Sequence, residues 1–481
     1  MLKLYNTLSR KKEVFRPKKG KKVNLFVCGI TPYDFAHIGH ARTYIVFDMI
    51  AKYLREKGFD VFYLQNITDI EDKIIQRARE KKITLKKLAR QFEKEYLKDM
   101  KILKIDSITK YARATDYIKE IINQVKRLKA KGFAYKIRGG IYYDISKLKD
   151  YGKLSNRTVS QAEDAVSRID ESKEKKNKGD FCLWKLAPYQ TYSGAGSKPA
   201  WPSPWGPGKP GWHIEDTAIT EKHFGPQYDI HGGARDLMFP HHEAEIAQME
   251  AISDKVPMVK YWLHAGFLIV KGRKMSKSLG NFITIQDFLK NSSPRILRFF
   301  ILKSHYRSPI NYTEKKVLQT KQQLERIDEF VGKIENFNLY KFPRSRKFEQ
   351  PSNFKKLILA TQKGFDMAME NDFNTPSALA SVFHLISRGN FLLDKEKLTQ
   401  LDAKNILKFL KKVDKIFNFI FWARPTKEKI PREILGLVIK RGKYRKQGNW
   451  KTADKIRRKV KKMGYLIEDV KKGQKIKRIN Q

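Results

Sequence analysis

Short apolar runs, separated by amphipathic stretches, dominate the first 270 residues. Runs at residues 23–28, 61–64, 228–230 and 268–270 have the length and composition of buried strands. Between the first two runs, from about residue 40 to residue 57, apolar positions recur at helical spacing. A strand, a helix and a second strand in this order predict a β-α-β unit with parallel strands.

The segments between these runs predict further helices and one hairpin. Residues 66–72 begin a set of charged helices that reaches about residue 131. Residues 133–145 alternate around two glycines and predict a β-hairpin. Residues 231–233 predict a turn after the strand at 228–230, and Pro240 predicts the start of a helix.

From residue 293 onwards, the pattern predicts helices only. Ser293 followed by Pro294 is typical of a helix N-cap and its first helical residue. Helical periodicity continues to about residue 422, with a break at residues 342–352 and a new start at Thr375. This region is therefore predicted to form a helical bundle.

The composition is that of a folded and strongly basic protein. The chain has 481 residues, of which 41% are hydrophobic, so it can form several domains with buried cores. Its 100 Lys and Arg exceed 51 Asp and Glu, for a formal net charge of +49. Such a charge favours nucleic acid through phosphate contacts. A general bias towards lysine is the alternative explanation.

Membrane and disulfide signals are both weak. No apolar run reaches the roughly 18 residues of a membrane span, and the N-terminus lacks the apolar core of a signal peptide. The only cysteines, Cys28 and Cys182, provide no disulfide framework and fit a reducing compartment. We therefore expect a cytoplasmic protein without a membrane partner. Cys182 lies in an apolar stretch and is expected in the core.

The last segment, residues 440–481, is especially basic. It carries seventeen Lys and Arg against three Asp and Glu, with Tyr444 and Trp450 between them. Unstacked bases of single-stranded nucleic acid can lie on such aromatic rings. A charged amphipathic helix exposed to solvent is the alternative interpretation.

Two short motifs carry the candidate chemistry. HIGH at residues 37–40 opens the first long helix, and KMSKS at residues 274–278 follows a predicted strand. A turn between a strand and a helix N-terminus is a common phosphate site, where Gly39 lets a nucleotide approach the backbone. Lysines on a loop can close over pyrophosphate and stabilise charge that develops in the transition state.

In this order, the two motifs resemble the signatures of the class I aminoacyl-tRNA synthetases. Further segments resemble the cysteinyl-tRNA synthetases specifically: CGITPY at 28–33, NITD at 66–69, GWHIE at 211–215, HGG at 231–233 and HHEAE at 241–245. The resemblance extends from the first strand to Asp469. It implies an enzyme that activates L-cysteine with ATP and transfers the cysteinyl group to the 3' end of tRNA(Cys).

The resemblance also implies an architecture of the α/β class. A Rossmann-type parallel sheet is expected to form the catalytic core, followed by helical modules. The expected domains are the catalytic domain at 1–270 with an insertion at about 120–205, a connective region with the KMSKS loop at 271–310, a helical bundle at 311–425 and a C-terminal anticodon-binding module at 426–481. Family members are usually monomers, so a monomer is expected.

Individual site residues follow from the same resemblance. The catalytic residues are His37, His40, Lys274 and Lys277. ATP, which brings Mg²⁺, is expected to contact these four and Gly39, Met275, Ser276 and Ser278. The cysteine-binding residues are Cys28, Thr68, Trp212 and His231. Anticodon contacts fall on Arg445, Trp450, Asp454 and Asp469, although Asp454 could instead pair with Arg457 or Arg458 in its own helix.

Metal ligands are implied at Cys28, Asp216, His241 and Glu245. His241 and Glu245 are four residues apart at a predicted helix start, so they share one face, and Cys28 can contribute a thiolate. A buried strand cysteine and a surface ion pair would account for the same residues without a metal. The family binds one zinc ion here, which accepts a substrate thiolate more readily than a serine hydroxyl.

Asp216 departs from the family pattern, which has a second cysteine at this position. Aspartate can also bind zinc. We expect the metal to be retained in a harder, weaker site that is more open to other divalent ions.

Two other functions fit parts of the sequence. A related ligase joins activated cysteine to a small amine, but its chains lack a tRNA-reading tail. A tRNA-binding paralogue without catalysis is conceivable because Asp216 could impair the metal site. The intact HIGH and KMSKS motifs argue against it, because a protein that only binds has no use for them.

Overall fold

The computed structural model describes residues 1–157, 172–187, 199–276, 279–337, 353–422, 431–470 and 473–478. The chain divides into two compact units, Met1–Ile420 and Phe421–Gln481. Among the described helices, none combines the length and the apolar character that crossing a bilayer requires.

A five-stranded parallel sheet forms the centre of the first unit. Its strand order is β11-β10-β3-β4-β5, and every neighbouring pair is parallel. The strands are β3 (Lys22–Ile30), β4 (Asp60–Ile67), β5 (Lys110–Arg113), β10 (Tyr228–Ala234) and β11 (Val259–Ala265). The predicted strands at 23–28, 61–64 and 228–230 are confirmed. The expected α/β class with a parallel sheet is therefore confirmed as well.

The turn predicted at residues 231–233 is wrong, because β10 continues through them. The reason lies in the packing of helix α1 (Ile38–Glu56) on the sheet. A Cβ atom added at Gly232 would lie 2.3 Å from the Phe47 ring of α1. Glycine here permits close packing of helix on strand rather than a reversal of the chain.

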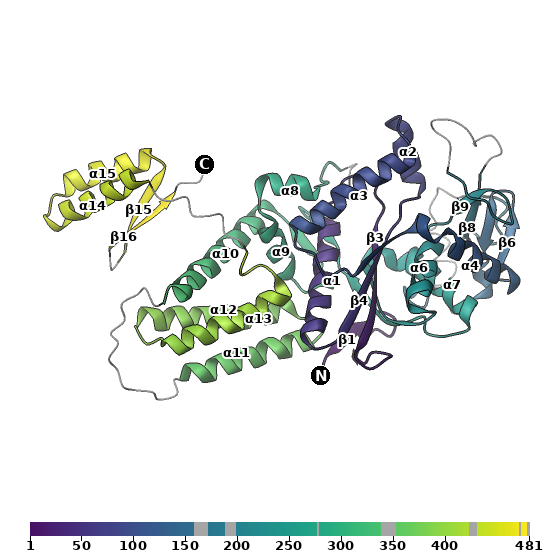
Figure 1. Cartoon of the computed structure of the whole chain (residues 1–481), viewed down its shortest axis with the longest axis horizontal. Coiled ribbons are helices and arrows are strands. Elements are labelled where there is room, and N and C mark those ends of the chain that lie inside the picture. The colour runs from purple at the N-terminus through teal and green to yellow at the C-terminus, as the bar shows by residue number, and fades with distance from the viewer. Residues whose placement is uncertain are drawn as a thin grey trace. The chain divides into compact units, whose positions relative to one another are not determined.

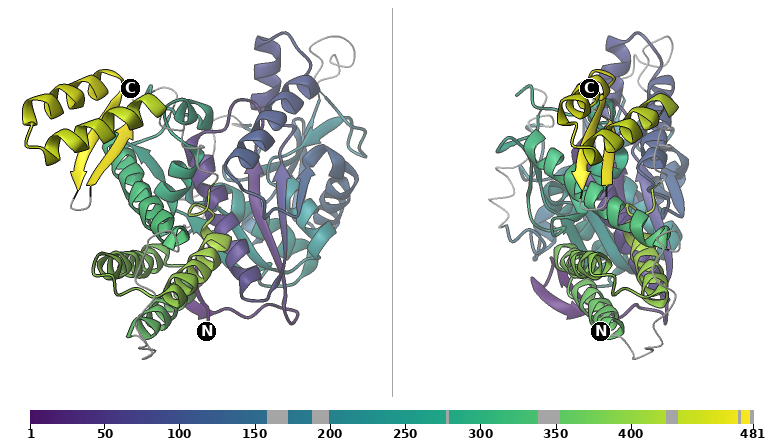
Figure 2. Two further views of the ribbon diagram at one scale, coloured as in Figure 1. Left: turned by 60° about the vertical axis from the view of Figure 1, so that its left-hand side comes forward. Right: turned by 90° about the vertical axis from the view of Figure 1, so that its left-hand side faces the viewer.

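Helices cover both faces of the sheet (Figure 1). On one side, α1 packs against the sheet and against two helices of the bundle, α9 and α13. On the other side lie α4, α6 and α7 (Figures 1 and 2). The bounds of the helices around the sheet are α2 (Asp72–Glu80), α3 (Leu85–Ile102), α4 (Ile118–Ala130), α6 (Ile214–Phe224) and α7 (Glu243–Ser253).

An antiparallel sheet of four strands interrupts the parallel sheet between β5 and β10. Its order is β6-β7-β8-β9, and its strands are β6 (Ala134–Ile137), β7 (Gly140–Tyr143), β8 (Phe181–Leu186) and β9 (Gly208–Pro210). The hairpin predicted at residues 133–145 is confirmed by the pairing of β6 with β7. Trp184 and Leu183 of β8 are fully buried against residues of α4, α6 and α7.

Short strands complete the first unit. β1 (Lys3–Asn6) and β2 (Lys11–Val14) form a hairpin. β12 (Leu268–Val270), predicted at these residues, pairs with β13 (Arg273–Lys274) and with β14 (Ile310–Tyr312).

The helical region begins where the sequence predicts it. The Ser293 side chain accepts a hydrogen bond from the Ile296 amide and caps α9, whose first residue is Pro294. Asn374 caps the restart predicted at Thr375. The helices are α8 (Ile285–Asn291), α9 (Pro294–Leu302), α10 (Glu314–Glu335), α11 (Asn353–Glu370), α12 (Thr375–Asp394) and α13 (Gln400–Phe417). The predicted break at 342–352 lies outside the described residues.

The second unit is small and built on four elements. Helices α14 (Arg432–Lys446) and α15 (Trp450–Lys462) precede a hairpin of β15 (Tyr465–Val470) and β16 (Gly473–Arg478). Its core consists of four buried residues, Ile434, Val438, Val460 and Ile467. The sequence predicted a basic helix here, but not this hairpin.

A buried ion pair links the sheet helix α1 to the bundle. Arg298 of α9 pairs with Asp48 of α1, and both side chains are fully buried. Arg298 also donates to the Phe417 and Leu103 carbonyls, at 2.6 and 3.1 Å. Lys52 lies 2.9 Å from the same carboxylate. Burial opposes ionisation of Asp48, but Arg298 and Lys52 outweigh it and lower the Asp48 pKa.

We predict that Arg298→Ala destabilises the protein by about 3–5 kcal/mol, because it leaves the Asp48 carboxylate buried without its main partner. Urea denaturation followed by circular dichroism measures the change. Arg326→Ala, at an exposed position of α10, is the control and should change stability by less than about 0.5 kcal/mol. Equal stability of the two variants would contradict a structural role for the pair.

Candidate active site and metal centre

The candidate site lies at the carboxyl ends of the parallel strands. Cys28 is near the end of β3, Asn66 near the end of β4 and His231 within β10. Because the strands are parallel, these ends meet at one edge of the sheet, where α/β proteins bind their ligands.

The HIGH segment forms the N-terminus of α1, and His37 is its N-cap. The Nδ1 atom of His37 accepts hydrogen bonds from the Gly39 and His40 amides, at 3.1 and 3.2 Å. The Nδ1 atom of His40 accepts from the His37 amide at 3.2 Å, and the two rings stack with centroids 3.6 Å apart. Each imidazole therefore accepts through Nδ1.

This capping arrangement determines where each proton lies. A neutral imidazole that accepts through Nδ1 carries its proton on Nε2. Burial, followed by the charge of His37, lowers the His40 pKa well below its ordinary value, so His40 is neutral at physiological pH. Because His37 already binds two amides of the helix end, the ring Nε2–H groups are the donors best suited to a phosphate.

The His37 ring leaves no room for a side chain at Gly39. A Cβ atom at this position would lie 2.8 Å from the His37 ring and 3.4 Å from the Met275 methyl group. The same contact places Met275 of the KMSKS segment beside the HIGH turn.

Backbone hydrogen bonds join the HIGH turn to the segment that follows KMSKS. The Ile38 amide donates to the Ile283 carbonyl at 3.1 Å, and the Ile285 amide donates to the Ala36 carbonyl at 2.8 Å. Within the KMSKS segment, Lys274 is exposed at the end of β13. The Ser276 amide donates to the Asn281 side chain at 2.9 Å. Lys277 and Ser278 lie outside the described residues.

The four predicted metal ligands come together. One ligand atom from each of Cys28, Asp216, His241 and Glu245 lies within 4.8 Å of the others, and all four residues are buried. The Nε2 atom of His241 is 3.0 Å from Asp216 Oδ2 and 3.3 Å from Glu245 Oε1. Four donors of this kind can surround a divalent metal ion.

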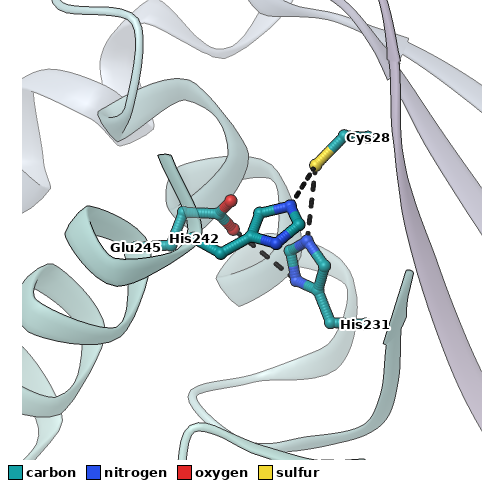
Figure 3. Close-up of side chains that lie close together, drawn as sticks. All are labelled: Cys28, His231, His242 and Glu245. Carbon is teal, nitrogen blue, oxygen red and sulfur yellow. Dashed lines mark hydrogen bonds and ion pairs between the residues drawn. The ribbon is translucent and has the colours of Figure 1, made fainter. Parts of the chain in front are cut away.

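A second, overlapping group of four could also hold a metal ion. It consists of Cys28, His231, His242 and Glu245 (Figure 3). The Cys28 sulfur lies 3.4 Å from His231 Nε2 and 3.2 Å from His242 Nε2. Sequence reasoning missed His242, although its position next to His241 was a signal that two imidazoles could enter one site.

The electrostatics of the site favour a cation. Burial raises the Cys28 pKa well above its usual range, and the charges of Asp216 and Glu245 add to it. Burial, followed by Asp216, likewise raises the Glu245 pKa. Among the described residues, the recorded ion pairs of both carboxylates are with histidines. Burial lowers the His231 pKa well below its ordinary value, so His231 stays neutral.

The two carboxylate oxygens of Glu245 indicate that a metal ion fits this site. They are buried and lack a hydrogen-bond donor among the described residues. One lies 3.3 Å from His241 Nε2, and the other lies 3.6 Å from His231 Nδ1. A bound cation would supply the partner that this carboxylate lacks. The residues therefore fit a metal ion.

The remaining predicted residues of this site lie around the metal group. Trp212 stacks on His241, with ring centroids 4.5 Å apart, and is 41% exposed. Thr68 is buried and accepts a hydrogen bond from Asn66 at 3.2 Å. His213, which sequence reasoning missed, lies 2.9 Å from His241, Nδ1 to Nδ1. Such a contact leaves His241 Nε2 directed at the carboxylates.

In the second unit, three of the four predicted anticodon residues lie together. Asp469 forms ion pairs with Arg441 and Arg445. Arg445 lies over the Trp450 ring, 5.4 Å from its centroid, and that ring is 58% exposed. Hydrogen bonding to Arg441 lowers the Asp469 pKa to about 2. In this structure, the Asp469 carboxylate therefore binds Arg441 and Arg445.

Asp454 is exposed on α15. Among the described residues, no recorded ion pair joins it to Arg457 or Arg458, so the alternative intrahelical pair is not formed here.

Comparisons with known proteins agree with this geometry. The structure resembles methionyl-tRNA synthetase from Mycobacterium tuberculosis in complex with methionyl-adenylate, with a TM-score of 0.59, 16% identity and coverage of 83% of this chain and 90% of that one. It also resembles LeuRS from Agrobacterium radiobacter in a ternary complex with tRNA and LeuAMS, with a TM-score of 0.63, 12% identity and coverage of 84% and 85%. At these identities, the likeness concerns the fold.

Family models define the class. The model described as tRNA synthetases class I (C) catalytic domain matches residues 14–322, and the model of the DALR domain matches residues 364–421. The fold and the site are thus those of a class I aminoacyl-tRNA synthetase. Proteins named cysteine–tRNA ligase from Thermococcus onnurineus and Methanococcus maripaludis are 42% and 45% identical to the chain. They match 100% of it, over 99% and 100% of their own lengths. The chain belongs to the cysteine–tRNA ligase family.

The expectation that Cys182 lies in the core is wrong, because it is only partly buried in β8, whereas Cys28 is 5% exposed. The strand is buried through its neighbours Leu183 and Trp184.

We predict that Cys182 reacts with a thiol reagent in the native protein and that Cys28 does not. Cys28 is only 5% exposed, so the reagent cannot reach its sulfur in the folded protein. Titration with a chromogenic disulfide at pH 8 should release one equivalent before denaturation and two afterwards. Cys182→Ser should remove the native equivalent. Rapid reaction of Cys28 in that variant would contradict the burial described here.

Proposed function

We propose that the chain activates L-cysteine with ATP and transfers the cysteinyl group to the 3' end of tRNA(Cys). One observation carries the proposal: the HIGH turn lies next to the strand that holds Cys28. The HIGH turn, paired with the segment after KMSKS, directly follows the strand that holds the buried Cys28. Membership of the cysteine–tRNA ligase family supports the same substrates.

The reaction needs no protein nucleophile. A carboxylate oxygen of cysteine attacks the α-phosphorus of ATP, and a P–O bond forms as the bond to pyrophosphate breaks. A ribose hydroxyl at the 3' end of tRNA then attacks the carbonyl carbon of the adenylate, and AMP leaves. The protein contributes positioning and electrostatic stabilisation.

The HIGH residues are proposed to bind the phosphates. His37 and His40 donate through Nε2–H to phosphate oxygens, as their capping hydrogen bonds through Nδ1 require. Gly39 leaves the turn open for the nucleotide. Lys274 and Lys277 stabilise the developing charge on pyrophosphate, and Met275, Ser276 and Ser278 complete the loop. Mg²⁺ enters with ATP.

The metal group is proposed to select the amino acid. Cys28, Asp216, His241 and Glu245 would hold one zinc ion, which offers a coordination position that a thiolate fills better than a hydroxyl. Trp212, His231 and Thr68 surround this position and would orient the cysteine. The Nε2 atom of His242 contacts the Cys28 sulfur and would help to orient it.

We predict that pyrophosphate exchange depends on cysteine and is at least about 100-fold weaker in Lys274→Ala, because a charge aimed at the transition state is lost. Lys271→Ala, on the same exposed segment, is the control and should retain exchange. Exchange with serine that matches exchange with cysteine would contradict selection through the metal group. So would activity that is unaffected by removal of the metal with a chelator.

Charging of tRNA distinguishes the two alternatives kept from the sequence. A ligase that uses a small amine would show cysteine-dependent exchange without charging a tRNA with a GCA anticodon. A paralogue that only binds tRNA would show neither. The second unit, Phe421–Gln481, favours the synthetase, because the chains of the small-amine ligase lack a tRNA-reading tail.

The second unit is proposed to bind the anticodon. Its exposed Trp450 ring, backed by Arg445, offers a stacking surface for an unpaired base. Arg441 and Asp469 hold Arg445 beside the ring. Asp454, which is exposed on the same helix as Trp450, is proposed to accept a hydrogen bond from a base amino group.

We predict that Trp450→Ala lowers kcat/KM for tRNA charging by the equivalent of about 1–3 kcal/mol, because one stacking surface is lost. Pyrophosphate exchange should not change, since this step uses no tRNA. Ile439→Ala removes another exposed apolar side chain from the same unit and serves as the control. A parallel loss of exchange in Trp450→Ala would argue against a role confined to tRNA.

The cytoplasmic location and the monomeric state stay predictions.

A further inference from the structure

Asn66 connects three parts of the candidate site through one side-chain amide. Its Nδ2 donates to Asp216 Oδ1 at 2.5 Å and to Thr68 Oγ1 at 3.2 Å. Its Oδ1 accepts from the Gly29 amide at 2.5 Å. The residue is 3% exposed. Both donor hydrogens and the carbonyl oxygen of this amide are therefore used.

The surroundings allow only one orientation of this amide. If it were flipped, its oxygen would face the Asp216 carboxylate and its NH₂ group would face the Gly29 N–H. The backbone of Asn66 is equally constrained, because a Cβ atom at Gly29 would lie 1.7 Å from the Asn66 carbonyl oxygen. Asn66 is thus held rigidly against the strand that carries Cys28.

The two oxygens of Asp216 consequently have different environments. Oδ1 is bound by Asn66, whereas Oδ2 lies 3.0 Å from His241 Nε2, inside the candidate metal group. A free carboxylate can bind a metal through one oxygen or both, whereas a thiolate has one donor atom. An aspartate that replaces a cysteine therefore needs its second oxygen held elsewhere to imitate a single donor.

We propose that Asn66 is the positioning residue that makes Asp216 a one-oxygen metal ligand, and that this contact lets a carboxylate serve at a position where the resembling synthetases use a thiolate. The inference rests on the metal group of the proposed function. Replacing a thiolate by a carboxylate leaves the charge of the ligand unchanged, since each carries one negative charge. Asn66 therefore has to restore only the geometry of a single donor atom.

The test is a double-mutant cycle on metal affinity in the full-length protein. Co²⁺ is the probe, and its dissociation constant is measured by competition with a chelator for the natural chain, Asn66→Ala, Asp216→Cys and the double variant. Asn66→Ala should weaken Co²⁺ binding about 10- to 100-fold when Asp216 is present, as expected for loss of a residue that orients a ligand. In the Asp216→Cys background, the same substitution should cost less than about threefold. Loss of the Gly29 contact is common to both backgrounds and cancels.

Cobalt spectra provide a second readout that a general loss of stability would not reproduce. The natural chain should show a thiolate-to-cobalt charge-transfer band, which Cys28→Ser removes, and the strong visible bands of a four-coordinate ion. Asn66→Ala should keep the thiolate band and weaken the visible bands, because both Asp216 oxygens become free to bind. With Asp216→Cys, the visible bands should not respond to Asn66→Ala.

Asn66→Asp provides the same cycle if Asn66→Ala does not fold. It keeps an acceptor for the Gly29 amide but places an oxygen against Asp216, so its penalty should again be larger with Asp216 than with cysteine. Equal penalties in the two backgrounds would overturn the inference while leaving the metal group intact. A natural chain that binds neither Co²⁺ nor Zn²⁺ would overturn the metal part of the proposed function, and the inference with it.

Discussion

The parallel pairing of β3 with β4 on one side and β10 on the other is the constraint on which the site depends. It brings Cys28, Asn66 and His231, which are far apart in sequence, to the same edge of the sheet. The close approach of α1 to this sheet, permitted by Gly232 beneath Phe47, then places the HIGH turn directly above that edge. Any change that separated α1 from β10 would separate the turn proposed to bind phosphate from the residues proposed to recognise the amino acid.

The second important feature is a group of buried acidic side chains at the candidate metal site. Cys28, Asp216 and Glu245 can each become anionic, yet their recorded side-chain partners among the described residues are imidazoles and the Asn66 amide. Such a group is unfavourable by itself, because burial penalises charge. A divalent cation would remove the penalty, and burial lowers the pKa values of His231 and His242, so that their neutral rings could coordinate it. The presence of aspartate rather than a second cysteine shifts the site towards oxygen donors and increases its dependence on neighbours that restrict the carboxylate.

The two signature motifs depend on each other structurally. The segment after KMSKS pairs with the residues around His37 through backbone hydrogen bonds. Buried Arg42, one turn into α1, donates to the Phe267, Tyr306 and Ser308 carbonyls, which lie just before strands β12 and β14. The segments that flank the lysine loop are therefore attached to the HIGH helix. The imidazole tautomers follow from helix capping, so the same hydrogen bonds that begin α1 also prepare its histidines to donate.

The sequence by itself determined the features that depend on local spacing. These are the strand–turn–helix at the HIGH motif, the cap at Ser293 and the helix start at Thr375, whereas resemblance to a family supplied the candidate metal ligands. Tertiary structure decided the rest. β10 continues through residues 231–233 because they pair with β11 and Gly232 leaves room for α1. Cys182 is only partly buried in β8. His242 approaches Cys28 because a helix and a strand from distant parts of the chain meet. The same holds for Asn66, whose three hydrogen-bond partners come from separate segments. Periodicity and motif spacing report on neighbours along the chain, whereas burial and hydrogen-bond partners are set by contacts between segments that the sequence does not order in space.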